Sequence, residues 1–326
     1  MKEQDPEFYI QGVLKNNRRI VAKTITLIES SLARDKEISF EIVKKILPYT
    51  GNSMRIGITG IPGVGKSTFI ENLGLFLCNA GHKVAVLAVD PTSRKSGGSI
   101  LGDKTRMEKL AARENTFIRP SPAGKTLGGV AAKTRETMLV CEAAGYDVIL
   151  VETVGVGQSE TKVSTMVDFF LALLIAGAGD ELQGIKKGLL EIADAIAINK
   201  ADNDNIEKAE RAKKIYEAAL HLVAPGSSSW TPPVLTCSSI IENGTENVWN
   251  AVLAHDKLKK DTGELGLKRK EQAVEWMWSL VNEGLKNKFL EDKKINKTIP
   301  VISQKVKQGI ISPSAAAEEL LSYFTI

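Results

Sequence analysis

The stretch GITGIPGVGKST, residues 57–68, limits the fold of this 326-residue chain more than any other segment. An apolar run, MRIGIT at 54–59, leads into it, and KSTFIENLGLFLCNA at 66–80 has apolar residues at helical spacing and ends before Gly81. A buried strand that passes through a glycine-rich turn into a helix can point backbone N–H groups inward around an anion. The segment therefore predicts an α/β protein with a phosphate-binding turn.

Five further short runs, rich in Val, Ile and Leu, predict the remaining strands. They lie at 84–89, 147–153, 168–176, 194–198 and 233–237. The runs are apolar throughout and helical segments separate them, which is typical of a mostly parallel sheet covered on both faces. Ligands of such sheets bind at the carboxyl ends of the strands, so the residues just after each run are the functional candidates.

Both ends of the chain are predicted to be helical. Residues 8–34 have apolar positions at helical spacing, and SFEIVKKIL at 39–47 predicts a second helix with Ser39 as its N-cap and Pro48 as its stop. The segment after about residue 255 is charged and contains no strand-like run.

One apolar face stands out in the C-terminal segment. Helical spacing in EQAVEWMWSLVNEGL places Val274, Met277, Trp278 and Val281 on the same side. We expect three parts in the chain: a helical N-terminal extension at 1–50, a sheet domain at 51–257 and a helical arm at 258–326.

The composition excludes several classes of protein. Apolar content of 43%, charged content of 25% and a net charge of +4 are ordinary for a soluble globular protein, and no basic run predicts binding to nucleic acid. The longest apolar run, at 169–179, is too short to cross a membrane, and the N-terminus has no apolar signal segment. We expect a cytoplasmic protein without a membrane or nucleic-acid partner. Cys78, Cys141 and Cys237 are far apart and predict neither disulfides nor a zinc site.

The turn matches the pattern G-x-x-x-x-G-K-[ST] from Gly60 to Ser67. In this pattern Lys66 supplies a cation to the β- and γ-phosphates, and the hydroxyl of Ser67 binds Mg²⁺. The candidate nucleotide contacts of the turn are Gly60, Pro62, Gly63, Val64, Gly65, Lys66, Ser67 and Thr68.

Three charged candidate residues follow the predicted strand at 84–89. Asp90 follows 84–89 and is either a metal ligand or a cap of the next element. Asp103 and Arg106 lie in GSILGDKTRM at 98–107, where switch segments often occur. Arg106 can neutralise charge in the transition state, and a surface ion pair is an equal alternative.

Glu152 ends the long strand at 147–153, where a carboxylate that faces Mg²⁺ is expected. With Gly155 it forms an E-x-x-G version of the GTPase D-x-x-G element, in which the Gly155 amide can sense a γ-phosphate. Val156 stands where Ras-like proteins have the Gln that orients water, so we expect slow intrinsic hydrolysis. The loop GAGDELQGIKKG at 177–188 is either a mobile surface loop or one that responds to the nucleotide.

The run at 194–198 is followed by Asn199-Lys200-Ala201-Asp202, which matches N-K-x-D. The carboxylate of Asp202 can accept two hydrogen bonds from guanine, whereas adenine lacks these donors, so guanine should be favoured by about tenfold or more. The stem of Lys200 can cover the base. Ser238 lies where GTPases have an S-A-K-like loop whose amide meets the base.

Together these motifs resemble the MeaB-like P-loop GTPases, chaperones of adenosylcobalamin-dependent methylmalonyl-CoA mutase that were once described as lysine/arginine/ornithine transport kinases. The motifs occur in the order and spacing of that family and extend over nearly the whole chain. They are TGIPGVGKST, GGSILGDKTRM, PAGKTLGGVAAKTRE, VETVGVGQSE, AGDELQGIKKG and NKAD. The expected fold is therefore a mostly parallel P-loop GTPase sheet flanked by helices, with a helical N-terminal extension and a helical C-terminal dimerisation arm.

The resemblance also implies ligands and roles. It implies GTP or GDP with Mg²⁺, the metal being surrounded by Ser67, Asp90, Asp103 and Glu152. The residues that we assign to catalysis are Lys66, Asp103, Arg106 and Glu152.

Signalling and partners follow from the same resemblance. It implies switches at 92–107 and 154–166, and a third at 177–188 in which Gln183 and Lys186 signal to the mutase. It further implies a homodimer joined by the C-terminal arm and a B12-dependent acyl-CoA mutase as the client.

Two other functions compete with this one. A GTPase that inserts nickel into a metallocentre would have a similar sheet and order of motifs, but such proteins usually show Cys or His metal ligands that this chain lacks. An ATP-dependent transport-associated kinase is disfavoured by Asn199 and Asp202, since both fit guanine.

Overall fold

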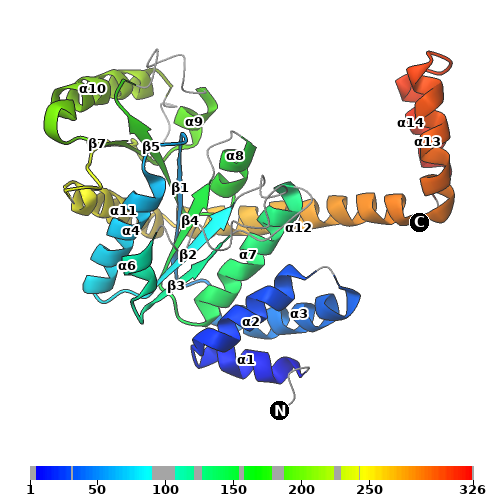
Figure 1. Cartoon of the computed structure of the whole chain (residues 1–326), viewed down its shortest axis with the longest axis horizontal. Coiled ribbons are helices and arrows are strands. Elements are labelled where there is room, and N and C mark those ends of the chain that lie inside the picture. Colours follow the sequence, from blue (N-terminus) through cyan, green and yellow to red (C-terminus); the bar gives the residue numbers. More distant parts are fainter. Residues whose placement is uncertain are drawn as a thin grey trace. The chain divides into compact units, whose positions relative to one another are not determined.

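A single parallel sheet forms the centre of the computed structural model, which describes residues 5–30, 32–89, 107–120, 127–153, 158–177, 187–223, 229–241 and 243–324. Seven strands of these residues pair in the order β3-β2-β4-β1-β5-β6-β7, every neighbouring pair parallel (Figure 1). The strands are β1 (Met54–Gly60), β2 (Val84–Val89), β3 (Thr116–Arg119), β4 (Val148–Thr153), β5 (Phe169–Ile175), β6 (Ala195–Asn199) and β7 (Val234–Thr236).

The sheet confirms the predicted fold class. All six predicted strands are present, with each end within about one residue of the predicted position, as is usual for strand and helix ends. The prediction missed β3, which has the sequence TFIR and pairs only with β2 at the edge of the sheet. Four residues are too few for an apolar run to stand out in the sequence.

Each face of the sheet has its own core, because alternate residues of a strand point to opposite faces. In β4, Val148 and Leu150 belong to one core, whereas Ile149 and Val151 belong to the other. All four side chains are fully buried. This two-sided burial explains why the strands are apolar throughout.

Helices supply the other half of both cores (Figure 1). One core includes side chains of α4 (Lys66–Asn79), α6 (Glu108–Ala111) and α11 (Thr245–Asp261). The other includes side chains of α7 (Leu127–Ala143), α8 (Gln158–Ser164), α9 (Lys187–Ile192) and α10 (Ile206–Val223). The N-terminal helices α1 (Pro6–Leu14), α2 (Arg18–Glu29) and α3 (Ala33–Ile46) pack against α7 and extend this second core.

The N-terminal helices differ from the prediction in their ends. The helical pattern at 8–34 is divided between α1 and α2, and the side chain of Asn17 caps α2 by accepting the N–H of Ile20 at 3.2 Å. Helix α3 begins at Ala33, so the prediction of Ser39 as an N-cap is wrong. Ser39 lies inside the helix and donates its hydroxyl to the carbonyl of Lys36 at 3.0 Å.

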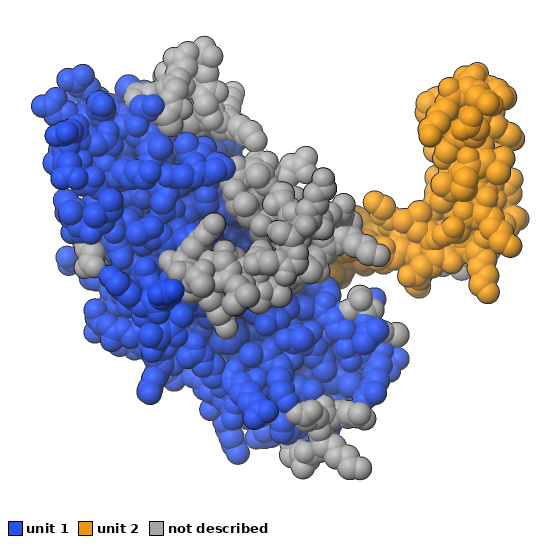
Figure 2. Space-filling model, in the orientation of Figure 1, with its two compact units in different colours: residues 1–272 blue, residues 273–326 orange. Residues whose placement is uncertain are grey.

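The chain divides into two compact units, residues 1–272 and residues 273–326 (Figure 2). Helix α12 (Glu264–Glu291) begins in the first unit and continues into the second, which α13 (Lys293–Lys307) and α14 (Pro313–Ser322) complete. The buried side chains of the second unit include Ile295, Ile302 and Ala316. Among the residues described, no helix combines the length and the apolar character that crossing a membrane requires. The three-part division at 1–50, 51–257 and 258–326 stays a prediction.

An ion pair at the amino end of β5 holds the start of α12 against the sheet. Arg269 donates from Nε to Oδ1 of Asp168 at 2.8 Å and from Nη2 to Oδ2 at 2.6 Å. The same guanidinium donates to the carbonyls of Gly51 and Ser53, in the segment that leads into β1. The backbone N–H of Arg55 donates to Asp168 Oδ2 at 2.9 Å, so one buried carboxylate joins α12, β1 and β5.

Replacing Arg269 by Met should destabilise the chain, because Asp168 would keep a buried charge without its main partner. Loss of one partner of a buried ion pair costs about 3–5 kcal/mol. We expect the free energy of unfolding, measured by urea titration with circular dichroism, to fall by that amount. Arg113→Met is the control, since the Arg113 guanidinium donates to Asn79 near the surface. A loss of less than about 1 kcal/mol for Arg269→Met, as for an exposed pair, would contradict this role.

Candidate functional site

The glycine-rich turn joins the end of β1 to the start of α4. Gly60 has φ 154° and Gly65, the N-cap of α4, has φ 93°, both in the region that favours glycine. A Cβ on Gly60 would lie 2.4 Å from the carbonyl oxygen of Leu173 in β5. The turn therefore requires glycine both for its backbone angle and for its close approach to the neighbouring strand.

Lys66 closes this turn. Its Nζ donates to the carbonyl oxygens of Gly60 at 2.7 Å and Ile61 at 3.2 Å. Burial lowers the pKa of Lys66 below its usual value, while the carboxylates of Glu152 and Glu160 act in the opposite direction. The ammonium group is thus held at the turn, where it can meet a polyanion.

Ser67 and Glu152 form the edge of the site where a metal ion is expected. The hydroxyl of Ser67, in the first turn of α4, donates to Oε1 of Glu152 at the end of β4 at 3.2 Å. A hydroxyl and a carboxylate are both oxygen donors, which is the ligand type that Mg²⁺ prefers. The described residues of this edge therefore fit Mg²⁺.

Asn199 connects the phosphate-binding turn to the end of β6. Its Nδ2 donates to the carbonyl of Val64 at 2.8 Å, and its Oδ1 accepts the hydroxyl of Ser239 at 3.0 Å. Asn199 is 1% exposed, so these bonds are shielded from water. The two motifs that lie about 130 residues apart in the sequence are thereby joined through one amide side chain.

Asp202 lies just beyond, with its carboxylate fixed by the loop after β7. Ser238 donates its hydroxyl to Asp202 Oδ2, while the backbone N–H groups of Ile240 and Ile241 donate to that hydroxyl at 3.2 and 3.4 Å. The N–H of Ser238 itself donates to the carbonyl of Asn243 at 2.8 Å. Ser238 thus touches the base-binding motif through its side chain, and its own amide is engaged within the loop.

Lys200, whose stem is predicted to cover the base, has φ 60° and an exposed side chain. Asn205 stabilises this unusual backbone by donating from Nδ2 to the carbonyl of Lys200 at 2.8 Å. The exposed stem is free of the core and can lie along a flat ligand.

The sequence did not point to Ser239 or Asn72. Ser239 bonds Asn199, and Asn72 of α4 donates from Nδ2 to the carbonyl of Ser239. These two residues tie the helix after the phosphate-binding turn to the loop after β7. Asn72 belongs to no pattern that can be recognised in a single sequence. Ser239 follows Ser238 in the S-A-K-like loop, at a position for which the sequence predicted no contact.

A second set of contacts that the sequence did not predict lies on the other face of β1 and β4. Thr153 donates its hydroxyl to Thr59 Oγ1 at 2.8 Å, and Thr59 donates to Oε1 of Glu160 at 3.3 Å. Glu160 is in the first turn of α8, and Thr59 directly precedes Gly60. Helix α8 is therefore bonded to the strand that leads into the phosphate-binding turn.

Several predicted residues cannot be placed by the structure. Asp90, Asp103, Arg106, Gly155, Gln183 and Lys186 lie outside the described residues. The roles of these residues stay predictions.

The comparisons with known proteins agree with this geometry. The model of the family described as methylmalonyl-CoA mutase-associated GTPase MeaB matches residues 21–294. The chain belongs to this family. The predicted family is thus confirmed, and with it a P-loop GTPase fold that binds a guanine nucleotide.

Individual relatives extend the match over nearly the whole chain. A protein of Caulobacter vibrioides described as a GTPase is 51% identical over 312 residues, which cover 96% of this chain and 95% of the relative. The mouse mitochondrial homologue of methylmalonic aciduria type A is 43% identical over 96% of this chain and 78% of its own length. A crystal structure of a LAO/AO transport system kinase superposes with a TM-score of 0.79 at 39% identity, covering 99% of this chain and 98% of that one.

Replacing Asp202 by Asn should change the preferred base. In the predicted site the carboxylate would accept from the N1–H and 2-amino groups of guanine, and an amide would present a donor at one of these positions. An unpaired buried polar group costs about 1–3 kcal/mol, so GTP affinity should fall by about tenfold or more and xanthosine triphosphate should bind better. Competition titration with a fluorescent GTP analogue measures both affinities. Unchanged selectivity for GTP would remove the guanine assignment.

Proposed function

We propose that the chain is a Mg²⁺-dependent GTP hydrolase that acts as a chaperone of an adenosylcobalamin-dependent acyl-CoA mutase of the methylmalonyl-CoA type. The observation that carries the GTP part is the buried hydrogen bond from Asn199 to Val64, which joins an N-K-x-D motif to a phosphate-binding turn. The name of the family, which includes association with that mutase, supports the choice of partner. The nickel-insertion and transport-kinase functions are the alternatives that the tests below must exclude.

In this proposal the described residues divide the work on GTP. Lys66 neutralises the β- and γ-phosphates, while Ser67 and Glu152 hold Mg²⁺ together with Asp90 and Asp103. When bound, Mg²⁺ would supply positive charge to the phosphate oxygens as the bond breaks between the γ-phosphorus and the oxygen that leaves with GDP. GTP is converted to GDP and phosphate, with water as the attacking group.

Hydrolysis should be slow without a partner. Val156 occupies the position of the water-orienting Gln of Ras-like proteins, so water is held poorly until other groups are ordered. Arg106 is the residue that we assign to charge in the transition state. Ordering of the switches by the mutase would then increase the rate.

The partner side of the proposal rests on the switches. The loop at 177–188, with Gln183 and Lys186, would report the nucleotide state to the mutase and so control loading or protection of its cobalamin cofactor. A cytoplasmic location and the absence of nucleic-acid and membrane partners are predictions from composition and belong to the same proposal.

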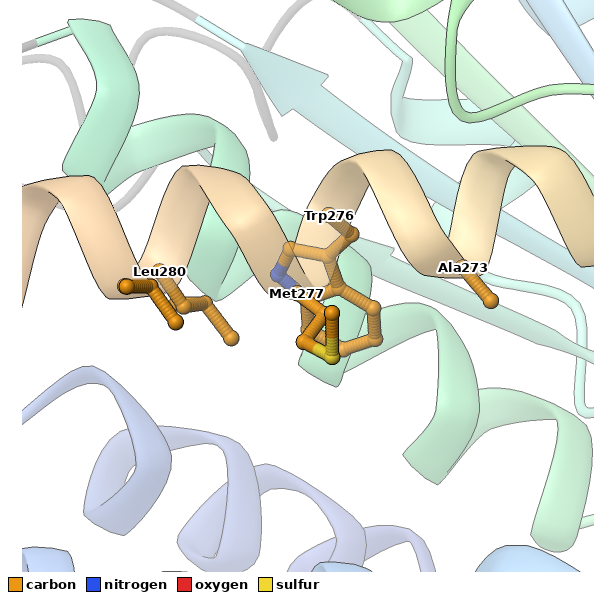
Figure 3. A pocket seen from close by; sticks show the side chains of 5 residues that line it. Ala273, Trp276, Met277 and Leu280 are labelled. Carbon is orange, nitrogen blue, oxygen red and sulfur yellow. The ribbon is translucent and has the colours of Figure 1, made fainter.

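The C-terminal unit would join two copies of the chain. Helix α12 exposes apolar side chains on the face predicted from the sequence, with Met277 50% and Trp278 57% exposed. Ala273, Trp276, Met277, Leu280 and Val281 line an open hollow of about 390 Å³ on this helix (Figure 3). An apolar surface of this kind on a soluble protein marks an interface, and a second copy with the same face is the occupant that we propose.

Turnover of GTP with and without the cell's B12-dependent acyl-CoA mutase tests the chaperone function. Phosphate release should be slow for the chain alone and should rise strongly with the mutase. In other GTPases, groups that a partner orders increase the rate of hydrolysis by about 10³-fold or more. Lys66→Ala is the control and should abolish nucleotide binding. No stimulation together with no complex would remove the chaperone function and leave GTP hydrolysis standing. Turnover of ATP in preference to GTP would instead favour the kinase.

Replacing Trp278 by Glu should weaken the dimer, because a charge would be buried in an apolar interface. Light scattering after gel filtration should then give the mass of one chain, 35.4 kDa, at concentrations where the unchanged protein has twice that mass. Phe40→Glu is a matched control, since Phe40 is 74% exposed on α3 in the first unit. Equal masses for Trp278→Glu and the unchanged protein would contradict a dimer made by this face.

A further inference from the structure

The connection between α8 and β5 is bonded by side chains from two other helices. Arg135 of α7 donates from Nη2 to the carbonyl and hydroxyl oxygens of Thr165 at 2.8 and 2.9 Å. The other end of the same guanidinium, Nη1, donates to the carbonyl of Gln272 in α12 at 2.9 Å. Arg135 therefore links the carboxyl-terminal end of α8 directly to α12.

Helix α12 binds the rest of this connection. Gln272 donates from Nε2 to the carbonyl of Val167 at 2.9 Å, and Lys268, one turn earlier, donates from Nζ to the carbonyl of Asp168 at 2.8 Å. With the bidentate pair of Arg269 and Asp168, one face of α12 holds the backbone that runs from α8 into β5. We call these contacts of residues 165–168 with Arg135 and α12 the α8–α12 joint.

The α8–α12 joint contains an unsatisfied group. Gln272 is 8% exposed, and its Oε1 is buried without a hydrogen-bond partner among the described residues. A buried acceptor without a partner costs about 1–3 kcal/mol, and such groups in native proteins call for an explanation. A second arrangement of the joint, in which this oxygen gains a donor, would supply one.

The other end of α8 reaches the phosphate-binding turn. Glu160 accepts the hydroxyl of Thr59, the residue before Gly60, at 3.3 Å. Between its two ends the helix rests on β1, where a Cβ on Gly57 would lie 3.0 Å from Cγ1 of Val163. Helix α8 is thus a short rigid element with one end at the turn and the other in the joint.

We propose that Arg135 and Gln272 position α8 by fixing its carboxyl-terminal end to α12, so that a shift of α8 on exchange of GDP for GTP is passed to α12. This proposal rests on the proposed function, since it requires a guanine nucleotide at the phosphate-binding turn. The contacts are short and directional, so α8 cannot move without either carrying α12 with it or exchanging its partners in the joint.

Hydrogen bonds and the covalent chain connect every step of the proposed route. It runs from Thr59 through Glu160 and the body of α8 to Thr165, and from there through Arg135 to Gln272. Contact alone does not establish coupling between two sites; a change at one end must alter the other. Gln272 Oε1 is the acceptor of the joint that has no partner among the described residues, so a second arrangement of the joint would be favoured if it gave this oxygen a donor.

Backbone hydrogen exchange of the full chain tests the proposal. Uptake of deuterium is measured by mass spectrometry for the peptides that cover 158–168 and 264–272, first with Mg²⁺ and GDP and then with Mg²⁺ and a non-hydrolysable GTP analogue. In the unchanged protein, both peptides should respond to the exchange of nucleotide. Affinities for both nucleotides are measured separately with fluorescent analogues.

Two variants break the joint in different ways. Arg135→Lys keeps the charge but cannot hold Thr165 and Gln272 at once with a forked pair of donors. Gln272→Met keeps the volume and removes both the bond to Val167 and the unsatisfied oxygen. In Arg135→Lys the nucleotide response at 264–272 should be lost. In Gln272→Met it should be reduced, because Arg135 still donates to the backbone carbonyl of residue 272. The response at 158–168 and the affinities should remain in both variants. Arg113→Gln, whose side chain bonds Asn79 on the opposite face of the sheet, is the control and should keep both responses.

The outcomes separate the two proposals. If neither nucleotide binds, the proposed function fails. If both bind but 264–272 shows no response in the unchanged protein, or keeps its full response in both variants, the coupling through the joint fails and the GTPase function stands.

Discussion

A buried hydrogen bond from the side-chain amide of Asn199 to the carbonyl of Val64 joins the two halves of the predicted nucleotide site. The phosphate half needs glycines with positive φ and the base half needs a fixed carboxylate, and these needs are met on different strands. Asn199 serves both because its amide has a donor and an acceptor: the donor reaches the turn and the acceptor receives Ser239. An Asp in this position would lack the donor and repel the carbonyl of Val64.

The two edges of the sheet carry different polar chemistry. At the carboxyl edge, Lys66 and Ser67 lie where a ligand can replace their protein contacts with its own oxygens. At the amino edge, the carboxylate of Asp168 accepts from Arg269 and from the backbone N–H of Arg55, so Asp168 and Arg269 form a fixed structural pair. The difference follows from the sheet being parallel: one edge collects strand ends that feed loops, and the other collects strand starts that must be anchored.

The sequence was sufficient to predict those features that depend only on residues close together in the chain. Apolar runs predicted six strands, and the motifs located Lys66, Glu152 and Asp202 at the ends of their strands. The edge strand β3 was missed because four residues show no period. The predicted cap at Ser39 was wrong because apolar side chains on both sides of it pack against the core, Ile38 partly buried before it and Ile42 fully buried after it. In α3, packing against the core therefore outweighs the preference of Ser for an N-cap position.

Contacts between residues far apart in the chain could not be predicted from the sequence for a different reason. Ser239, Asn72 and Arg135 act through partners that are 30 to 167 positions away, so no spacing in a single chain marks them. These residues hold secondary-structure elements to one another, and they determine which elements can move independently. A GTPase that signals its nucleotide state needs such contacts, because a shift at the phosphate-binding turn has no effect elsewhere unless a bonded element transmits it. In this fold the described contacts give α8 such a place, since it is bonded to Thr59 just before the turn and, through Arg135, to α12.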